Sequence, residues 1–354
     1  QWGPQIINVT GAWDYTYGQG VTVAIVDTGV QLNHPDLQPN IVAGYDFANN
    51  DADPTDDHSL SHGTHVAGTV AAVANNGIGG VGIAPRAKIM PVKVLDAQGS
   101  GYDSDVIAGI QYAADNGAKV VNLSLGAYCD VTTDPNCPSR ALEDAVNYAT
   151  SKGALVVAAA GNDNADRMLY PAGYLNAVAV GATTSTDTRA SFSNYGNWVD
   201  VAAPGANIYS TMRSSNYGYL SGTSMATPHA AGLAALLLSH NPAATVVQVR
   251  QAIQTTGVAL PNADWGRSTT LRRLDALAAV LALPAPNPPR LDVSRNASLF
   301  LSDTASDPPA PTIEVYNRGG STLSWRATVS AGAPWLTVTP TSGTAPSTFT
   351  LNAV

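Results

Sequence analysis

Charged residues are scarce in this chain: Asp, Glu, Lys and Arg make up 12% of its 354 residues, about half the share in an average soluble protein. The charge that is present is mainly acidic, with 26 Asp and Glu against 17 Lys and Arg and a net charge of −9. This balance disfavours nucleic acids and anionic membrane surfaces as partners. Small residues replace the missing charges, a composition more typical of a tightly packed exported protein than of a cytosolic one.

Long hydrophobic runs are also missing. No run approaches the roughly 18 apolar residues of a membrane-spanning helix, so we expect no membrane span. The first residues do not form a signal peptide, and Gln1 stands where an initiator methionine is expected, which indicates a processed or trimmed form. Neither an internal repeat nor a coiled-coil pattern is present, so we expect a monomer.

Cysteine is limited to two residues, Cys129 and Cys137, in a loop rich in Asp, Thr and Pro. No histidine or third cysteine lies close enough in sequence to complete a zinc site. A local disulfide formed in an oxidising compartment is therefore favoured over two free thiols.

Apolar residues, in contrast, make up 45% of the chain and allow a large core. Apolar, β-branched runs predict strands at 21–26, 88–95, 119–125, 154–160, 177–182 and 199–202. After a lead-in of turn residues, helices are predicted at 61–75, 103–116, 139–152, 224–240, 245–256 and 271–281. Because strands alternate with helices and are apolar on both faces, we expect an α/β fold with a parallel sheet covered on both sides.

The composition changes sharply after residue 283. Residues 284–289 read as an extended, Pro-rich linker. Beyond it only short alternating runs remain, which predict a small all-β sandwich module at 290–354. Its last run has no turn after it, which is consistent with a truncated module. We therefore expect one large domain at 1–283 and a small one after the linker.

Four polar residues stand where a predicted strand ends or a helix begins: Asp27, His62, Asn162 and Ser224. The carboxyl ends of parallel strands form one crevice, so we expect these side chains together there. A serine hydroxyl needs a base to take its proton, an imidazole can do so near neutral pH, and a buried carboxylate fixes the imidazole tautomer. We predict Ser224 as the nucleophile, His62 as the base, Asp27 as its partner and Asn162 as an oxyanion donor beside the Ser224 backbone N–H.

Each of these residues also has an ordinary structural interpretation. Ser224 or Thr223 would be an N-cap of the apolar helix that follows, with Pro228 in the first turn, where its missing N–H costs little. Asp27 and Asn162 would be turn formers, and His62 a solvated residue at a helix start. All four at one edge of one sheet, in the order Asp, His, Asn, Ser, favour a catalytic site instead.

The blocks around these residues resemble the signatures of the subtilisin-like serine proteases, the subtilases. They read Val26-Asp27-Thr28-Gly29, His62-Gly63-Thr64-His65-Val66-Ala67-Gly68, Ala158-Ala159-Ala160-Gly161-Asn162 and Gly222-Thr223-Ser224-Met225-Ala226-Thr227-Pro228-His229. Three further blocks resemble the thermitase-like branch: Gln1-Trp2-Gly3-Pro4, Asn33-His34-Pro35-Asp36-Leu37 and Ser221-Gly222-Thr223-Ser224. The resemblance covers roughly residues 1–281 and implies the three-layer subtilisin-like fold. It also assigns the catalytic role to His62 and leaves His65 structural.

The resemblance implies an endopeptidase that binds an extended substrate as an added strand. The matching edge segments are Gly99-Ser100-Gly101 and Ser124-Leu125-Gly126. The S1 pocket would be walled by the second segment and by Ala159-Ala160-Gly161, with Leu169 at its floor, where the family commonly has Gly. Because Leu is larger, we predict an apolar S1 pocket that prefers Leu, Met or Phe over Trp.

Structural calcium is a further implication. Oxygen-bearing side chains alternate in the first candidate site, as suits a hard cation: Asp46, Asn49, Asp51, Asp53 and Thr55. A solvated acidic loop is the alternative interpretation. A second family site would use the side chain of Asp36 with Asn76 and the carbonyls of Val73, Ile78 and Gly80, although its further acidic ligand lies upstream of Gln1. A third, weaker site would use the Ala172 and Tyr174 carbonyls with Asp200.

The resemblance also implies secretion, protein or peptide substrates, and a cleaved N-terminal propeptide that inhibits the enzyme and assists folding. The loop from Cys129 to Cys137 departs from the shorter family version and begins three residues after Gly126, so we expect it to stiffen or crowd the S1 wall. Segments of the C-terminal module resemble Ig-like repeats found after bacterial secreted enzymes, with Trp325 and Trp335 expected in its core.

Two other functions were weighed. An α/β-hydrolase esterase needs Gly-x-Ser-x-Gly with its acid and histidine after the serine, whereas here residue 226 is Ala and both partners precede Ser224. An adhesin or inactive scaffold would bind through residues 285–354, but the presence of all four catalytic residue types disfavours it. A secreted, calcium-supported serine endopeptidase is the favoured hypothesis.

Overall fold

The computed structural model describes residues 1–130, 132, 136–283, 291–293, 312–317, 324–329 and 336–353. The chain forms two compact units, residues 1–284 and 285–354. The Pro-rich segment predicted as a linker lies outside the described residues.

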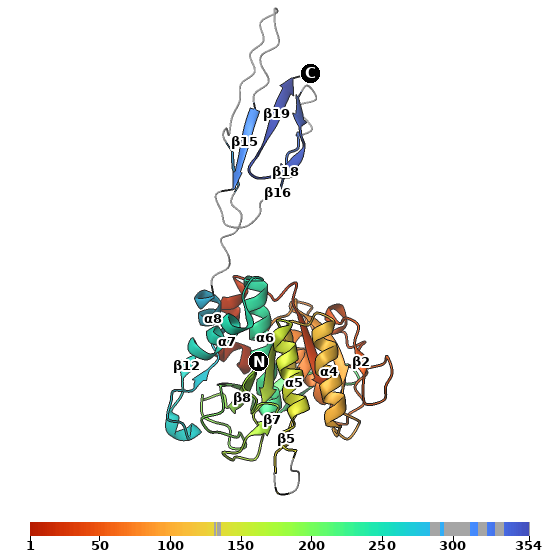
Figure 1. Cartoon of the computed structure of the whole chain (residues 1–354), viewed down its shortest axis with the longest axis vertical. Helices are drawn as coiled ribbons and strands as arrows, with labels where there is room; N and C mark the ends of the chain where they lie inside the picture. The colour runs from red at the N-terminus through yellow and green to blue at the C-terminus, as the bar shows by residue number, and fades with distance from the viewer. Residues whose placement is uncertain are drawn as a thin grey trace, which may run out of the picture. The chain divides into compact units, whose positions relative to one another are not determined.

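A nine-stranded sheet forms the centre of the first unit (Figure 1). Its strand order is β12-β13-β9-β8-β6-β4-β1-β3-β2, and every neighbouring pair is parallel except β12 and β13. The predicted α/β class with a parallel sheet is therefore confirmed. The strands are β1 (Thr22–Asp27), β2 (Tyr45–Asp46), β3 (Lys88–Lys93), β4 (Val120–Leu123), β6 (Leu155–Ala159), β8 (Ala177–Thr183), β9 (Val201–Pro204), β12 (Val258–Ala259) and β13 (Arg272–Arg273).

Helices cover both faces of this sheet. Successive side chains of β1 point to opposite faces, so Val23 and Ile25 join one buried cluster, while Ala24 and Val26 join another. The first cluster includes side chains of α3 (His62–Ala71), α6 (Thr223–His240), α7 (Val246–Thr255) and α8 (Ala276–Ala282). The second includes side chains of α4 (Asp103–Asp115) and α5 (Arg140–Ser151), which lie side by side in Figure 1.

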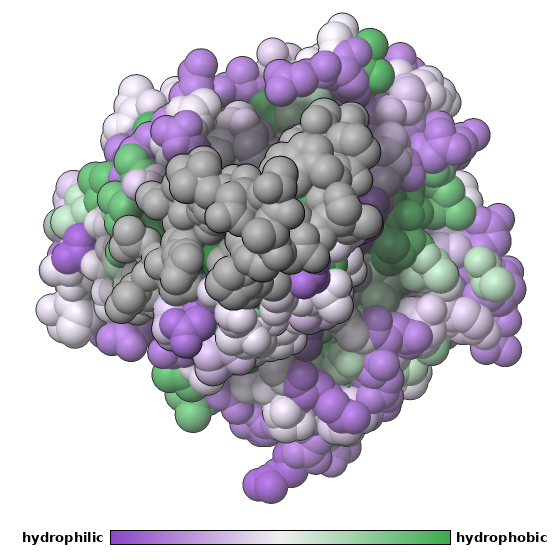
Figure 2. Space-filling model, turned by 90° about the horizontal axis from the view of Figure 1, so that it is seen from above, coloured by the Kyte–Doolittle hydropathy of each residue, from purple (hydrophilic) through white to green (hydrophobic). Residues whose placement is uncertain are grey.

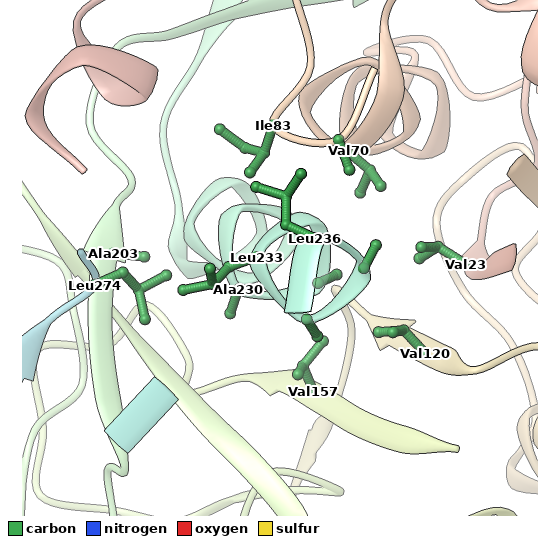
Figure 3. Packing of buried hydrophobic residues seen from close by; sticks show 14 of the residues in the cluster. Val23, Val70, Ile83, Val120, Val157, Ala203, Ala230, Leu233, Leu236 and Leu274 are labelled. Atoms are coloured by element: carbon green, nitrogen blue, oxygen red, sulfur yellow. The ribbon is translucent and has the colours of Figure 1, made fainter. Parts of the chain in front are cut away.

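Helix α6 runs through the middle of the larger core. It is apolar on all sides, and such a helix is stable only when it is buried. In Figure 3, Ala230, Leu233 and Leu236 lie at the centre of the packing; residues from the strands, from α3 and from flanking segments surround them: Val23, Val120, Val157, Ala203, Val70, Ile83 and Leu274. Burial of this helix fixes where its N-terminus, and therefore Ser224, meets the sheet.

The prediction that Pro228 lies in the first turn of this helix was wrong. Because α6 begins at Thr223, Pro228 is its sixth residue. There its missing N–H deprives the Ser224 carbonyl of the usual i−4 helical hydrogen bond. The hydroxyl of Ser124 donates to that carbonyl instead, at 2.8 Å.

Several elements differ from the predicted pattern. The lead-in contains two short helices, α1 (Trp2–Ile6) and α2 (Val9–Trp13). The helix predicted at 271–281 begins only at Ala276, because Arg272–Arg273 forms a strand that pairs with β12 on one side and β9 on the other. Two unpredicted antiparallel pairs are β10 (Ile208–Met212) with β11 (Asn216–Leu220), and β5 (Ala127–Tyr128) with β7 (Leu169–Tyr170). Short 3₁₀ turns occupy η1 (Gln38–Asn40) and η2 (Asn262–Trp265).

The second unit contains two small antiparallel sheets. Its described strands are β14 (Leu291–Val293), β15 (Thr312–Asn317), β16 (Ser324–Arg326), β17 (Leu336–Thr339), β18 (Ser342–Thr344) and β19 (Ser347–Ala353). Trp325 is buried against Phe349 and donates its indole N–H to Ser347 at 2.8 Å. The other tryptophan predicted in this core, Trp335, lies outside the described residues.

The surface visible in Figure 2 is mostly hydrophilic or neutral, with hydrophobic residues in separate groups. Among the described residues, no helix combines the length and the apolar character that crossing a bilayer requires. The visible part of this face is therefore not dominated by one continuous apolar patch.

Candidate active site

The four predicted catalytic residues come from four elements of the first unit. Asp27 ends β1, His62 begins α3, Asn162 follows β6, and Ser224 is the second residue of α6. The strands β1, β4 and β6 are neighbours in the sheet, so Asp27 and Asn162 lie along one edge of it, and the contact of His62 with Asp27 places His62 at the same edge. Helix α6 packs against the same strands and presents Ser224 there.

The imidazole of His62 is paired with the buried carboxylate of Asp27. Nδ1 of His62 lies 2.7 Å from Oδ1 of Asp27, whose side chain has no exposed surface. Burial lowers the pKa of His62, but the negative charge and hydrogen bond of Asp27 outweigh burial and hold that pKa above the ordinary value of 6.5. The pair thus has the arrangement in which a carboxylate orients an imidazole and stabilises its protonated form.

A second buried carboxylate, Asp56, fixes the start of α3 against the end of β1. It accepts hydrogen bonds from the Thr28 hydroxyl at 3.0 Å and from both the backbone N–H and the hydroxyl of Thr64, at 3.1 and 2.6 Å. Gly63 lets the two elements approach closely, because a Cβ there would stand 2.1 Å from the Gly29 carbonyl oxygen. Sequence reasoning missed Asp56, which looked like one more acid in a polar loop.

Ser224 is tied to the neighbouring edge segment by two hydrogen bonds. Its hydroxyl donates to the Ser124 carbonyl at 3.0 Å, and its own carbonyl accepts from the Ser124 hydroxyl at 2.8 Å. Asn122 donates to the same Ser124 hydroxyl at 2.9 Å. The Ser224 hydroxyl must therefore give up its bond to the Ser124 carbonyl before it can donate to His62.

The side chain of Asn162 is oriented by Thr223, the residue before Ser224. Oδ1 of Asn162 accepts hydrogen bonds from the Thr223 backbone N–H at 2.8 Å and from its hydroxyl at 3.0 Å. Because Oδ1 is occupied in this way, the amide Nδ2 is the group left to donate to a ligand. The first N–H groups of α6 lack helical acceptors, so this end of the helix is suited to a developing negative charge.

A cleft of about 520 Å³ lies beside His62. Both predicted edge segments line it: Gly99, Ser100 and Gly101 on one side, and Ser124, Leu125 and Gly126 on the other. The structure therefore brings these two segments together across one groove next to the candidate base. A groove between two backbone edges can hold an extended peptide by strand addition.

A smaller pocket of about 270 Å³ adjoins Ser224. Of the predicted S1 residues, it is lined by Leu125, Gly126, Ala159, Gly161 and Leu169. Leu169 packs directly on Gly126, where an added Cβ would stand 2.8 Å from its side chain. Ala160 is not in the lining: its side chain is buried in a separate cluster with Trp265, on the other side of the backbone.

Tyr128 and Asp163 also line this smaller pocket. Tyr128 was not among the predicted pocket residues. The Tyr128 hydroxyl accepts a hydrogen bond from Asn194 at 2.8 Å, and the Arg167 guanidinium lies over the Tyr128 ring. Tyr128 stands directly before Cys129, and the predicted disulfide between Cys129 and Cys137 is present. The disulfide loop therefore begins at a residue of the pocket wall.

His65 and His229 are buried outside the candidate site. His65 Nε2 bonds to the Ile208 carbonyl at 2.8 Å, and His229 Nδ1 bonds to the Met225 carbonyl at 2.9 Å. Burial lowers the pKa of each to about 4. Both are neutral packing groups at neutral pH, in keeping with a structural role for His65.

The candidate calcium ligands differ in how well they fit a cation. In the first set, Asp46 is hydrogen-bonded to Asn49 and Asp53 to Thr55. No three acidic, His or Cys side chains converge on a metal position anywhere in the described residues. In the second set, Asp36 is fully buried, Oδ1 accepts from Asn76 at 2.6 Å, and Oδ2 has no hydrogen-bond partner. An unpaired buried carboxylate oxygen is costly, so this second set fits calcium.

The third candidate site does not fit. The Asp200 carboxylate pairs with the guanidinium of Arg250 at 3.2 Å and accepts from Gln254 at 2.8 Å. It also accepts the Ala179 backbone N–H at 2.9 Å. The guanidinium already supplies the positive charge that a cation would bring. We therefore do not propose Asp200, Ala172 and Tyr174 as calcium ligands.

Known proteins are similar to the first unit. Residues 18–276 match the model of the Subtilase family. The thermophilic serine proteinase of Bacillus sp. (strain AK1) is 52% identical over 257 residues, which cover 72% of this chain and 61% of that protein. Thermitase of Thermoactinomyces vulgaris is 52% identical over 256 residues, covering 72% of this chain and 88% of thermitase.

A solved structure agrees with these matches. A structure of proteases from Pseudoalteromonas arctica superimposes with a TM-score of 0.70 and 37% identity, covering 78% of this chain and 94% of that one. The match spans less than two thirds of the AK1 proteinase but most of thermitase and of the solved chain. The chain belongs to the subtilase family of serine proteases.

Proposed function

We propose that this protein is a secreted serine endopeptidase that hydrolyses peptide bonds of extended polypeptides. The observation that carries the proposal is the 2.7 Å hydrogen bond between His62 and buried Asp27, at the edge of the sheet where Ser224 lies in the first turn of α6. An oriented imidazole next to a serine is the arrangement that activates a hydroxyl nucleophile.

In the proposed reaction, His62 Nε2 takes the proton of Ser224 while Ser224 Oγ bonds to the scissile carbonyl carbon. The carbonyl electron pair moves onto oxygen, where Asn162 Nδ2 and the Ser224 backbone N–H stabilise the charge. The intermediate then expels the amine, which takes the proton from His62, and leaves an acyl-enzyme on Ser224. Water attacks the ester with His62 again as base, releasing the acid and restoring the hydroxyl.

The substrate is proposed to bind as a strand between residues 99–101 and 124–126, with its P1 side chain in the pocket beside Ser224. Leu169 reduces the depth of that pocket, because it packs on Gly126 at the base. We therefore propose a preference for Leu, Met or Phe over Trp at P1.

Calcium is proposed as a structural cofactor that supplies positive charge and holds loops together. Asp36 and Asn76, with carbonyls of Val73, Ile78 and Gly80, are the favoured ligands because of the unpaired Asp36 oxygen. The loop Asp46–Thr55 remains the second candidate. A disulfide and the relationship to subtilisins support the proposed secretion.

Replacing Ser224 tests the proposed function. Wild-type protein and Ser224→Ala would be compared on casein and on a Leu-P1 peptide anilide at pH 8 with Ca²⁺. We expect wild-type cleavage that a serine-directed sulfonyl fluoride blocks, and a loss of about 10⁶-fold in kcat in the variant. Thr227→Ser, also in α6, is the matched control. A folded wild type that cleaves neither substrate would refute the proposal and favour a binding role.

A further inference from the structure

A second histidine, His58, lies beside the catalytic imidazole. The rings of His58 and His62 meet edge to face with centroids 6.3 Å apart. His58 also lines the substrate cleft, together with Leu95 and Gly99. The proposed reaction uses only His62, so His58 has no role in it.

The backbone of His58 is held by hydrogen bonds through both its N–H and its carbonyl. The backbone N–H donates to Asp56 at 3.1 Å, and the carbonyl accepts from Ser61 N at 2.9 Å and from Arg213 Nη1 at 3.0 Å. Nε2 lies 3.3 Å from the position that a Cβ on Gly99 would occupy. Because Gly99 has no side chain, open space remains next to Nε2 at the edge of the cleft.

The environment of the ring indicates where its proton lies. Nδ1 of His58 is buried and has no hydrogen-bond partner. A buried N–H without an acceptor is rarer than an unpaired acceptor, so Nε2 is favoured over Nδ1 as the protonated nitrogen. Nε2–H is then a donor that faces the open space beside Gly99.

The geometry of an extended substrate places its P2 side chain on this side of the cleft. Successive side chains of a strand point in opposite directions. With P1 in the pocket beside Ser224, P2 points away from it, toward His62, Leu95 and the edge at Gly99. We propose, on the basis of the proposed function, that His58 selects substrates whose P2 side chain carries a hydrogen-bond acceptor, asparagine in particular.

The surrounding charges favour an amide over a carboxylate at P2. Asp56 contacts the His58 backbone, Asp57 is its neighbour in sequence, and exposed Asp96 interacts with it electrostatically. The nearby cations are already engaged, Lys93 with Asp57 and Arg213 with backbone carbonyls. A further carboxylate would meet this acidic group, whereas a neutral amide oxygen would not.

Paired substrates and graded variants test the proposal. Two peptide anilides would carry the same P1 residue and either Asn or Leu at P2, which are similar in size but differ in the acceptor. Wild type, His58→Leu, His58→Asn and His58→Gln would be compared by the ratio of kcat/KM for the two substrates. This ratio does not depend on the fraction of each preparation that is folded.

Wild type is expected to favour Asn over Leu by about five- to tenfold, the effect of one net hydrogen bond. The ratio should fall toward one in His58→Leu, and also in His58→Asn, whose amide cannot reach the Nε2 position. In His58→Gln the ratio should return to the wild-type value. An unchanged ratio in His58→Leu, or no rescue by Gln, would overturn the proposal. If wild type cleaves neither substrate, the proposed function itself has failed; cleavage without an Asn preference overturns only the role of His58.

Discussion

The Asp27–His62 pair is expected to set the pH range of the proposed reaction. A general base must be unprotonated, so kcat/KM should rise with pH through the pKa of His62 in the free enzyme. Asp27 opposes the effect of burial and holds this pKa above 6.5. We therefore expect the acid limb of the wild-type profile to have its midpoint above that value.

Asp27→Asn removes the charge that raises the pKa of His62. With burial left as the main influence, the acid limb should move to lower pH, while kcat falls by about 10⁴-fold because the imidazole tautomer is no longer fixed. Peptide anilide hydrolysis from pH 5 to 10 would measure both effects. Asp14→Asn, at an exposed position in the N-terminal segment, is the charge-matched control. An acid limb whose midpoint does not move would show that Asp27 does not raise the pKa of His62.

Single residues also form hydrogen bonds that hold the candidate site together and that sequence patterns do not reveal. Pro228 removes a helical hydrogen bond from the Ser224 carbonyl, and Ser124, which directly follows β4 and lies 100 residues earlier, replaces it. Asp56 bonds to Thr28 and Thr64 and so joins β1 to α3. Both contacts link segments far apart in sequence, so they follow from the fold and not from local patterns.

At the scale of elements, β5 and β7 shape the pocket beside Ser224. Tyr128 of β5 pairs with Leu169 of β7, and both line the pocket. Leu169→Gly would remove the side chain at its base. We expect the ratio of kcat/KM for Trp-P1 over Leu-P1 peptide anilides to rise by at least about tenfold, the lower end of what a single methylene group is worth in a hydrophobic pocket. Leu175→Gly, at a largely exposed position, is the control. Wild-type enzyme that already prefers Trp would contradict the proposed pocket.

The disulfide restrains the loop that follows β5. Removing both thiols with Cys129→Ser and Cys137→Ser should lower the free energy of unfolding by about 2–3 kcal/mol, the usual effect of closing a short loop. Thermal unfolding and the P1 profile would be measured together. Wild type with and without reducing agent provides the comparison. If neither the melting temperature nor the P1 profile changes, the loop does not stiffen the pocket wall.

At the scale of the whole molecule, calcium is expected to add to stability by binding only the folded chain. At a concentration about 100 times the dissociation constant, a single site contributes about 2.7 kcal/mol. EDTA should therefore lower the wild-type melting temperature. Asp36→Asn should show a smaller difference between calcium and EDTA, whatever its own melting temperature.

The comparison with a second variant assigns the site. Asp53→Asn alters the exposed loop Asp46–Thr55 and serves as the matched control. If Asp53→Asn loses the calcium effect while Asp36→Asn keeps it, the favoured ligands are wrong and the loop is the site. A wild type whose melting temperature is insensitive to EDTA would argue against structural calcium altogether.

Much of the fold and the candidate site follows from the sequence alone. Apolar β-branched runs separated by helical patterns determine a parallel sheet, because such strands must be buried on both faces. Asp27, His62, Asn162 and Ser224 stand at the ends of these elements, and topology alone gathers such ends at one edge. The two cysteines, close together in a polar loop, indicate their disulfide in the same way.

Only the tertiary structure decided what depends on contacts between distant segments. The short pairs β5–β7 and β12–β13 have too few residues to show a periodic pattern, and their partners decide whether they form. Tyr128 lines the pocket, whereas Ala160 is buried in a separate cluster. The path of the backbone sets the direction of each side chain, and local sequence patterns do not show that path. The unpaired Asp36 oxygen and the pairing of Asp200 with Arg250 separate two acids that look alike in sequence. Local sequence patterns predict which helices and strands form, whereas burial and long-range hydrogen bonds determine what each side chain contacts.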